Sequence, residues 1–128
     1  MGRKTIVEPE AQDETLAQWR GGDVVVWMYH ASHRRMALRL SAPGLMEELY
    51  VVVVGCRFIQ GPFSWRASDL RILVGEVRDS GGLTTGRVVF DPSVGFRLEC
   101  RDVALATGSI GDHDENFNGF LGEQDESP

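Results

Sequence analysis

The longest apolar run of the chain is Leu49-Tyr50-Val51-Val52-Val53-Val54-Gly55. Its four consecutive valines favour extended backbone, because β-branched side chains are restricted in a helix and pack well on a pleated sheet. A strand with one wet face alternates apolar and polar residues, whereas this run is apolar at every position. The run therefore predicts a β-strand that is covered on both faces. It is also far shorter than the ~20 residues that cross a bilayer.

The sequence on either side of this run predicts further strands. Val24-Val25-Val26-Trp27-Met28-Tyr29 is likewise apolar on both sides, and other segments alternate with a period of two. Segments rich in Gly, Pro, Asp and Ser separate them at residues 41–44, 61–62, 79–82 and 91–95. The predicted strands are residues 24–30, 35–40, 49–57, 70–77, 86–91 and 96–103. In a chain of 128 residues they predict an all-β fold, with a single small domain of six to seven mostly antiparallel strands in a sandwich or a rolled barrel.

One short helix is predicted ahead of the strands, over residues 13–20. Asp13 is placed to cap its N-terminus, Gly21 suits the left-handed C′ position, and Leu16 and Trp19 lie on one face. Two helical turns are unstable alone in water, so we expect these two apolar side chains to pack on the sheet. The chain then divides into a flexible N-terminus at 1–12, a β domain at 13–107 and an acidic, disordered tail at 108–128.

The net charge of −6 belongs almost wholly to the tail. Residues 21–107 carry ten arginines against nine acidic residues, whereas residues 108–128 carry six acidic residues and no basic one. Binding to a nucleic-acid duplex needs a basic stripe that releases phosphate counterions. The balanced β domain therefore disfavours nucleic acid as a partner, but it leaves room for a small arginine-lined site.

Four arginines are candidate binding residues. Residues 35–40 and 96–101 each alternate apolar and polar side chains, which indicates one buried face and one wet face. On the wet faces lie Arg35, Arg39, Arg97 and Arg101. Arginine makes forked contacts to carboxylates and is frequent among interface anchors. The alternative is a bias in composition, since twelve of the thirteen basic residues are arginine.

The register of the first two strands predicts an apolar face that needs a cover. An even-numbered connection at 31–34 places two sets of side chains on opposite faces, and an odd one would exchange the sets. The first set is Trp27, Tyr29, Met36 and Leu38. The second set is Val24, Val26 and Met28, beside Arg35, Ala37 and Arg39. A short helix covers the second set only in part, so the sequence predicts a homodimer.

The chain contains none of the motifs that mark a nucleophile elbow, a phosphate-binding loop, a dinucleotide site or an H-E-x-x-H metal site. His30, His33, Cys56 and Cys100 are the residue types of a four-ligand zinc site. The H-x-x-H spacing, however, points the two histidines to opposite faces of a strand. We expect no cofactor, and both cysteines to be reduced and buried.

Residues 114–125 resemble the calcium loop of an EF-hand. Oxygen-bearing side chains occupy positions one, three and five, and glycine occupies position six. The residues at the ligand positions are Asp114, Asn116, Asn118, Phe120 and Asp125. Position twelve holds Asp in place of the bidentate Glu, and two glycines precede the loop where a helix would be needed. We therefore expect a solvated acidic tail, with calcium binding as the alternative.

The same tail permits a third interpretation. Phe117, Phe120 and Leu121 in acidic surroundings are typical of a short linear motif. Such a motif docks on a partner or folds back on the arginine-bearing strands.

These patterns predict a non-enzymatic binding or assembly module that acts through contacts with a partner protein or a second copy. The alternative is a small-molecule-binding β-barrel, or a small enzyme whose site assembles only in three dimensions. A cavity lined by aromatic side chains would favour the alternative, and a filled core would favour the module. The aromatic candidates are Trp27, Tyr29, Phe58, Trp65 and Phe96. No basic segment leads into an apolar stretch, so we expect a cytoplasmic protein without membrane contacts.

Overall fold

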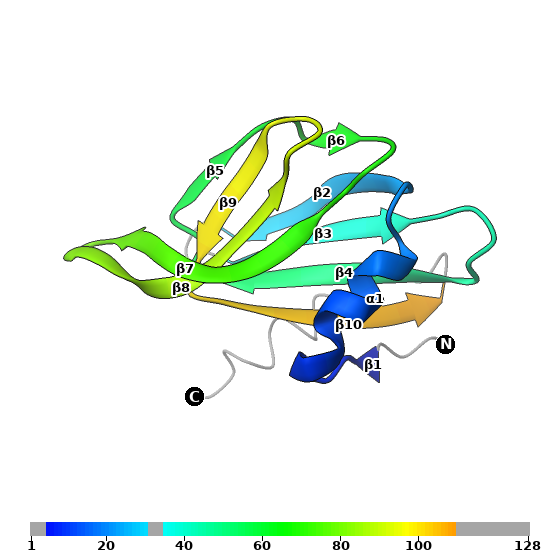
Figure 1. Ribbon diagram of the computed structural model, residues 1–128, viewed down its shortest axis with the longest axis horizontal. Helices are drawn as coiled ribbons and strands as arrows, with labels where there is room; N and C mark the ends of the chain where they lie inside the picture. Colours follow the sequence, from blue (N-terminus) through cyan, green and yellow to red (C-terminus); the bar gives the residue numbers. More distant parts are fainter. Residues whose placement is uncertain (1–4, 31–34, 110–128) are drawn as a thin grey trace.

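The computed structural model describes residues 5–30 and 35–109, with side chains for all but residues 27–30 and 109. One helix, α1 (Gln12–Gln18), follows a 3₁₀ turn (Pro9–Ala11). The described ranges otherwise form ten strands (Figure 1). They are β1 (Thr5–Ile6), β2 (Asp23–His30), β3 (Arg35–Ser41), β4 (Glu47–Val54), β5 (Phe58–Gln60), β6 (Ser64–Trp65), β7 (Arg71–Asp79), β8 (Gly82–Asp91), β9 (Phe96–Cys100) and β10 (Asp102–Ser109).

The strands form two antiparallel sheets. The six-stranded sheet has the order β1-β10-β4-β3-β2-β6, and the four-stranded sheet has the order β5-β9-β8-β7. Figure 1 shows the four-stranded sheet lying across one face of the six-stranded sheet. The predicted all-β, mostly antiparallel fold with one short N-terminal helix is confirmed. Of the two predicted arrangements, the sandwich is the one that the described strands form, since they do not close into a barrel.

The core lies between the sheets. The six-stranded sheet contributes Met36, Leu38, Leu40, Leu49, Val51, Val53 and Leu105, and the four-stranded sheet contributes Val89, Phe96 and Leu98. Leu16 of α1 and Trp19, the C-cap residue of this helix, are buried in the same cluster, as their spacing predicts. α1 therefore covers the same side of the six-stranded sheet as the four-stranded sheet does.

The ends of α1 differ in part from the prediction. Ala11 is the N-cap and supplies no side-chain hydrogen bond, while Asp13 lies in the first turn. A carboxylate there is favoured by the positive end of the helix dipole. Gly21 has the predicted left-handed conformation, with φ +89°, and its N–H donates to the carbonyl of Ser68 at 2.8 Å. In the described part of the chain, no helix is long and apolar enough to span a membrane.

A β-bulge in β2 changes the predicted pairing with β3. Tyr29 lies opposite Met36 as predicted, but the register shifts after Val26. The extra residue at a bulge reverses the alternation, so Val26 lies opposite Leu38 and shares the core face with Val24. The predicted facing of these two valines is wrong. The two valines therefore do not form an uncovered apolar surface. The homodimer was predicted from such a surface, so Val24 and Val26 no longer support that prediction.

The opposite face of the six-stranded sheet, here called the outer face, is buried as well. Its central rows across β3, β4 and β10 are Arg39, Tyr50 and Ala106, then Ala37, Val52 and Ala104. Tyr50, Ala37 and Ala106 are 0% exposed, and Val52 is 2% exposed. The prediction that this face of β3 is exposed to solvent is therefore wrong, because Arg35 and Arg39 lie beside apolar residues that are buried.

The predicted strand 96–103 is two strands in different sheets. Only Arg101 separates β9 from β10, and its N–H donates to the carbonyl of Val54 at 2.9 Å. The alternation of apolar and polar residues continues through this crossing, so the sequence pattern does not show that the chain changes sheets there. β10 then extends to Ser109, so the first two residues assigned to the tail pair with β4. Residues 110–128 lie outside the described residues.

A buried carboxylate holds the turn between β8 and β9. Asp91 is 0% exposed and accepts hydrogen bonds from Trp65 Nε1 at 2.8 Å and from the Asp69 N–H at 2.7 Å. It also accepts from the N–H and the hydroxyl of Ser93, at 2.9 and 2.6 Å. Burial acts to raise the pKa of Asp91, but these hydrogen bonds outweigh burial and hold its pKa below the ordinary value.

Candidate binding site

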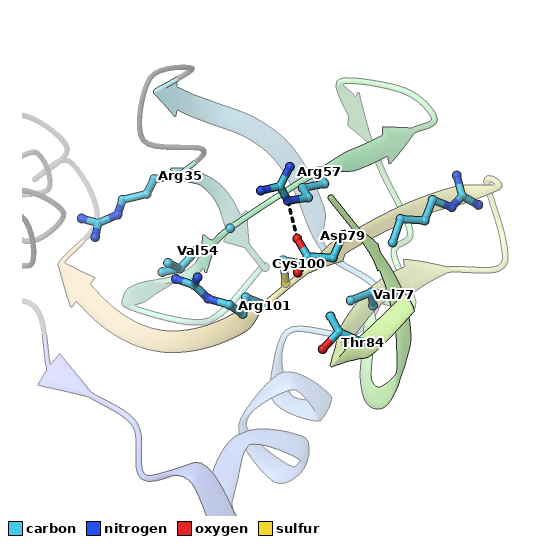
Figure 2. A pocket seen from close by; sticks show the side chains of 10 residues that line it. Arg35, Val54, Arg57, Val77, Asp79, Thr84, Cys100 and Arg101 are labelled. Carbon is cyan, nitrogen blue, oxygen red and sulfur yellow. Dashed lines mark ion pairs between the residues drawn. The ribbon is translucent and has the colours of Figure 1, made fainter. Parts of the chain in front are cut away.

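Two crossings of the chain between the sheets lie side by side and form the candidate site. β4 leads into β5 through residues 55–57, and β9 leads into β10 through Arg101. Besides the bond from Arg101 to Val54, the N–H of Arg57 donates to the carbonyl of Glu99 at 3.1 Å. A cavity of about 190 Å³, here called the arginine pocket, opens beside these crossings (Figure 2). It is lined by Arg35, Val54, Gly55, Arg57, Val77, Arg78, Asp79, Thr84, Cys100 and Arg101.

Gly55 holds the first crossing in place. Its φ is +72°, and a Cβ atom added there would lie 2.9 Å from the Cβ of Arg101. Gly55→Ala therefore adds the cost of a left-handed conformation to a clash that pushes the two crossings apart. We expect the free energy of unfolding to fall by about 2 to 4 kcal/mol, measured by urea denaturation.

Gly44→Ala is the matched control for this variant. Gly44 has φ +84°, but nothing lies within 4 Å of an added Cβ atom. Its expected loss is about 1 kcal/mol, from the backbone conformation alone. Equal losses in the two variants would contradict a steric role for Gly55.

The arginine pocket has an excess of positive charge. Its lining carries four guanidinium groups and one carboxylate, Asp79, which pairs with Arg57 at 2.9 Å. Figure 2 shows the ion pair of Arg57 with Asp79 near Cys100, the guanidinium of Arg101 next to Val54, and the guanidinium of Arg35 pointing away from the other side chains. Within the described ranges, no carboxylate forms an ion pair with Arg101. Arg101 is therefore the group in the pocket best placed to receive an anion.

Arg78 is held by the protein itself. Its Nε lies 3.5 Å from Glu99 Oε1, and its Cζ lies 4.1 Å from the centre of the Phe58 ring. Glu99 is buried, accepts the Arg78 N–H at 3.1 Å and pairs with Arg97 at 3.1 Å. Burial acts to raise the pKa of Glu99, but these hydrogen bonds and the two arginines hold its pKa below the ordinary value. These contacts fix Arg78 to the four-stranded sheet, where its side chain forms part of the pocket wall.

The thiol in the pocket is neutral. Cys100 is buried, and burial is the main cause that raises its pKa to about 12. Burial also raises the pKa of Cys56, and both cysteines are free. The thiolate is the reactive form of cysteine, so Cys100 at neutral pH is an apolar surface rather than a nucleophile.

The four arginines predicted as binding residues lie in three places. Arg35 and Arg101 line the arginine pocket together. Arg39 pairs with Glu48 on the outer face, with Nε and Oε2 3.7 Å apart. Arg97 is engaged with Glu99 on the four-stranded sheet. The structure therefore brings together two of the four.

Sequence reasoning missed Arg57 and Arg78. Arg57 lies in the connection from β4 to β5, and Arg78 lies near the end of β7. No alternation marks a face at either position. The one available signal for Arg57 was Gly55, since a glycine directly after an apolar strand often marks a change of direction.

The predicted metal ligands do not form a described site. In the ranges that the structure covers, no group of three or more His, Cys, Asp or Glu residues could hold a metal ion. Of the zinc set, only Cys56 and Cys100 have described side chains. The calcium-loop residues lie outside the described residues, so calcium binding stays a prediction. They are Asp114, Asn116, Asn118, Phe120 and Asp125.

The chain matches no model of a known protein family, and a search of curated proteins finds no match either.

Proposed function

We propose that this protein is a non-enzymatic binding module that acts through protein–protein contacts, and that the arginine pocket receives an acidic group of the partner. The observation that carries the proposal is Arg101, which lines the pocket together with Arg57 and has no ion-pair partner among the described carboxylates. The planar fork of a guanidinium matches the two oxygens of a carboxylate. An acidic side chain or chain end supplies that group.

The size of the pocket supports a side chain as the bound group. Sites for drug-sized ligands enclose about 300 to 1,000 Å³. The arginine pocket encloses about 190 Å³, with Val54 and Val77 as apolar walls. This space suits one carboxylate on a short apolar stem.

The packing of the core also supports a module over a small-molecule barrel. The rings of Trp65 and Phe96 lie 4.7 Å apart and pack inside the core cluster. A barrel that binds a small molecule needs such aromatic side chains to line an enclosed space. Here these two rings fill the interior instead.

The chemistry of the pocket favours binding over catalysis. A catalytic site needs a poised nucleophile or base. The thiol of Cys100 is protonated at neutral pH, and the carboxylate of Asp79 is paired with Arg57.

Titration of the full ¹⁵N-labelled chain with hexaglutamate tests the proposal. We expect saturable shifts of the guanidinium Nε–H resonances of Arg57 and Arg101. Arg101→Ala should weaken binding about tenfold or more, because it removes a charge-assisted hydrogen bond. Raised salt should weaken binding in the parent chain, since exposed charges are screened.

Arg66→Ala is the matched control for the titration. Arg66 is exposed and lies outside the arginine pocket, and its replacement changes the net charge by the same amount. We expect this variant to bind like the parent. Equal weakening in both variants would mean that hexaglutamate responds to net charge alone, and unshifted guanidinium resonances would place binding elsewhere.

A further inference from the structure

A groove runs along β7, which is an edge strand of the four-stranded sheet. α1 lies next to this strand (Figure 1). Two cavities of about 500 and 280 Å³ follow the strand, and both are lined by Asp13, Ile72 and Leu73. Because they share these residues, the cavities form one depression, here called the β7 groove. It lies between β7 on one side and α1 with the preceding 3₁₀ turn on the other.

The pairing of β7 with β8 leaves every second residue of β7 with a free backbone edge. A two-residue loop at 80–81 joins the strands, so Asp79 and Gly82 form a hydrogen-bonded pair. Such bonded pairs alternate with pairs whose N–H and C=O groups point away from the partner strand. The odd-numbered residues of β7 therefore bond to β8. The even-numbered residues, Ile72 and Val74 among them, direct these groups toward the open edge.

Arg78 supports this alternation independently. It is even-numbered, and its N–H donates to the side chain of Glu99 at 3.1 Å rather than to β8. Ile72 and Val74 have no such partner, since no group among the described residues bonds to their N–H or C=O. Both residues line the β7 groove. Within the described part of the chain, the groove therefore offers backbone donors and acceptors that are unpaired.

The same edge exposes apolar side chains. Leu73 is 47% exposed and Val74 is 62% exposed. β7 has nine residues and contains neither proline nor lysine, the residues that commonly prevent an edge strand from pairing. A long edge of this kind can accept a further strand, because main-chain hydrogen bonds supply affinity and alternate side chains supply specificity.

Carboxylates dominate the lining of the larger cavity. Glu10, Asp13 and Asp102 line it, against one guanidinium, that of Arg87. None of these three carboxylates forms an ion pair with a basic group of the described residues. A segment with a positive charge next to its apolar residues therefore complements the groove.

We infer that the β7 groove binds an extended segment of a partner protein as an added strand, and that this segment carries apolar residues at alternate positions and a lysine or arginine. Its backbone bonds to Ile72 and Val74, and its basic side chain pairs with Asp13 or Asp102. The inference goes beyond the proposed function. The groove shares no lining residue with the arginine pocket, and its larger cavity has the opposite excess of charge.

Two other occupants fit the groove less well. Residues 110–128 of the same chain carry six acidic residues and no basic one, so the carboxylates of the groove repel them. A second copy that paired through its own β7 would extend the sheet across the place that α1 occupies beside this strand. A single extended segment needs only the width of the groove.

Titration of the full ¹⁵N-labelled chain with the peptide Lys-Val-Lys-Val-Lys-Val-Lys, blocked at both ends, tests the inference. We expect saturable shifts of the amide resonances of Ile72 and Val74. Their hydrogen exchange should slow about tenfold or more in the complex, because each N–H gains an acceptor. Saturable binding that leaves both amides unchanged would overturn the inference, and so would the absence of binding.

Two backbone-methylated forms of this peptide test whether it binds as a strand. In a strand, the N–H groups of successive residues point to opposite edges. Methylation of the valine nitrogens or of the lysine nitrogens therefore blocks one edge at a time and preserves every side chain. We expect one form to bind about tenfold more weakly than the other. Equal affinities of the two forms would contradict an added strand and overturn the inference.

Val74→Pro removes an N–H that faces the groove and spares the pairing with β8, which does not use it. The affinity for the peptide should fall about tenfold. Val74→Thr is the matched control, because it keeps the N–H and the β-branched shape, and it should bind like the parent. Equal affinities of the two variants would overturn the inference. The methylated peptides act on the parent chain, so they decide the matter even if Val74→Pro does not fold.

Asp13→Asn tests the charge of the groove and should weaken binding of the peptide severalfold. Glu14→Gln is the matched control, since Glu14 is exposed in the same turn of α1, lies outside the groove lining and changes the net charge equally. We expect this variant to bind like the parent. Equal weakening in both variants would mean that the peptide responds to net charge alone, and would overturn the choice of a basic segment.

Hydrogen exchange of the free chain tests the other occupants. Slow exchange of Ile72 and Val74 without peptide would overturn the inference. If this protection rose with the concentration of the chain, the edge would belong to a second copy, and if it did not, to a segment of the same chain.

The two proposals fail separately. Hexaglutamate and the guanidinium resonances of Arg57 and Arg101 test the arginine pocket. The lysine–valine peptide and the amide resonances of Ile72 and Val74 test the β7 groove.

Discussion

Replacing Asp91 with alanine is expected to lower the free energy of unfolding by about 3 to 4 kcal/mol. The change leaves Trp65 Nε1 and the N–H of Asp69 without their acceptor in a buried site. It also releases Ser93, which fixes the turn into β9 through two bonds. Chemical denaturation followed by tryptophan fluorescence measures the loss.

Two further variants locate the origin of this loss. Trp65→Phe removes one donor and retains a smaller aromatic ring beside Phe96, so a double-mutant cycle with Asp91→Ala should show a coupling of about 1 kcal/mol or more. Asp91→Asn keeps the shape and one acceptor, so its loss should be smaller than that of alanine. Additive losses in the cycle would contradict the bond from Trp65 as a source of stability.

The carboxylate of Asp91 also makes stability depend on pH. Its pKa in the folded chain lies below the ordinary value of 3.8, because its hydrogen bonds outweigh the effect of burial. The unfolded chain therefore takes up the proton first as pH falls. The stabilisation is complete above about pH 4 and is lost as pH falls through the folded pKa. The difference in stability between the parent and Asp91→Asn should shrink over that range.

Leu38→Ala is the second large loss that we expect, about 3 to 4 kcal/mol. Leu38 is 0% exposed and lies opposite Val26 and Val51 in the centre of the six-stranded sheet. Truncation leaves a cavity between rigid strands that cannot close. Leu73→Ala is the matched control, because Leu73 is 47% exposed on β7 and should lose well under 1 kcal/mol. Similar losses at the two leucines would show that the core is misplaced.

The sequence predicts the fold well where a periodic pattern is long. β2, β3, β4, β7 and β8 each contain seven or more residues, and their apolar patterns identify them. β1, β5 and β6 have two or three residues, which is too short for a period to appear. These short strands form because neighbouring strands offer unpaired backbone N–H and C=O groups. The residue pattern of so short a segment does not indicate such pairing.

The candidate site is less predictable than the fold because it lies where the chain changes sheets. Arg57 and Arg101 are forty-four positions apart, and the pairing of β4 with β10 brings their crossings together. A bulge of one residue also reversed the predicted facing of Val24 and Val26. Periodicity identifies faces within one strand, whereas bulges and crossings depend on tertiary contacts.

The place of β10 in the six-stranded sheet has a consequence for biosynthesis. β10 is late in the chain, yet it lies between β1 and β4, where residue 107 pairs with residue 5 and residue 104 with residue 52. During translation the edge of β4, with its run of valines, stays unpaired until β10 leaves the ribosome. Such an edge is a template for wrong pairing. Because its pairings are far apart in sequence, the sheet should also close slowly, on the millisecond-to-second scale of β-sandwiches.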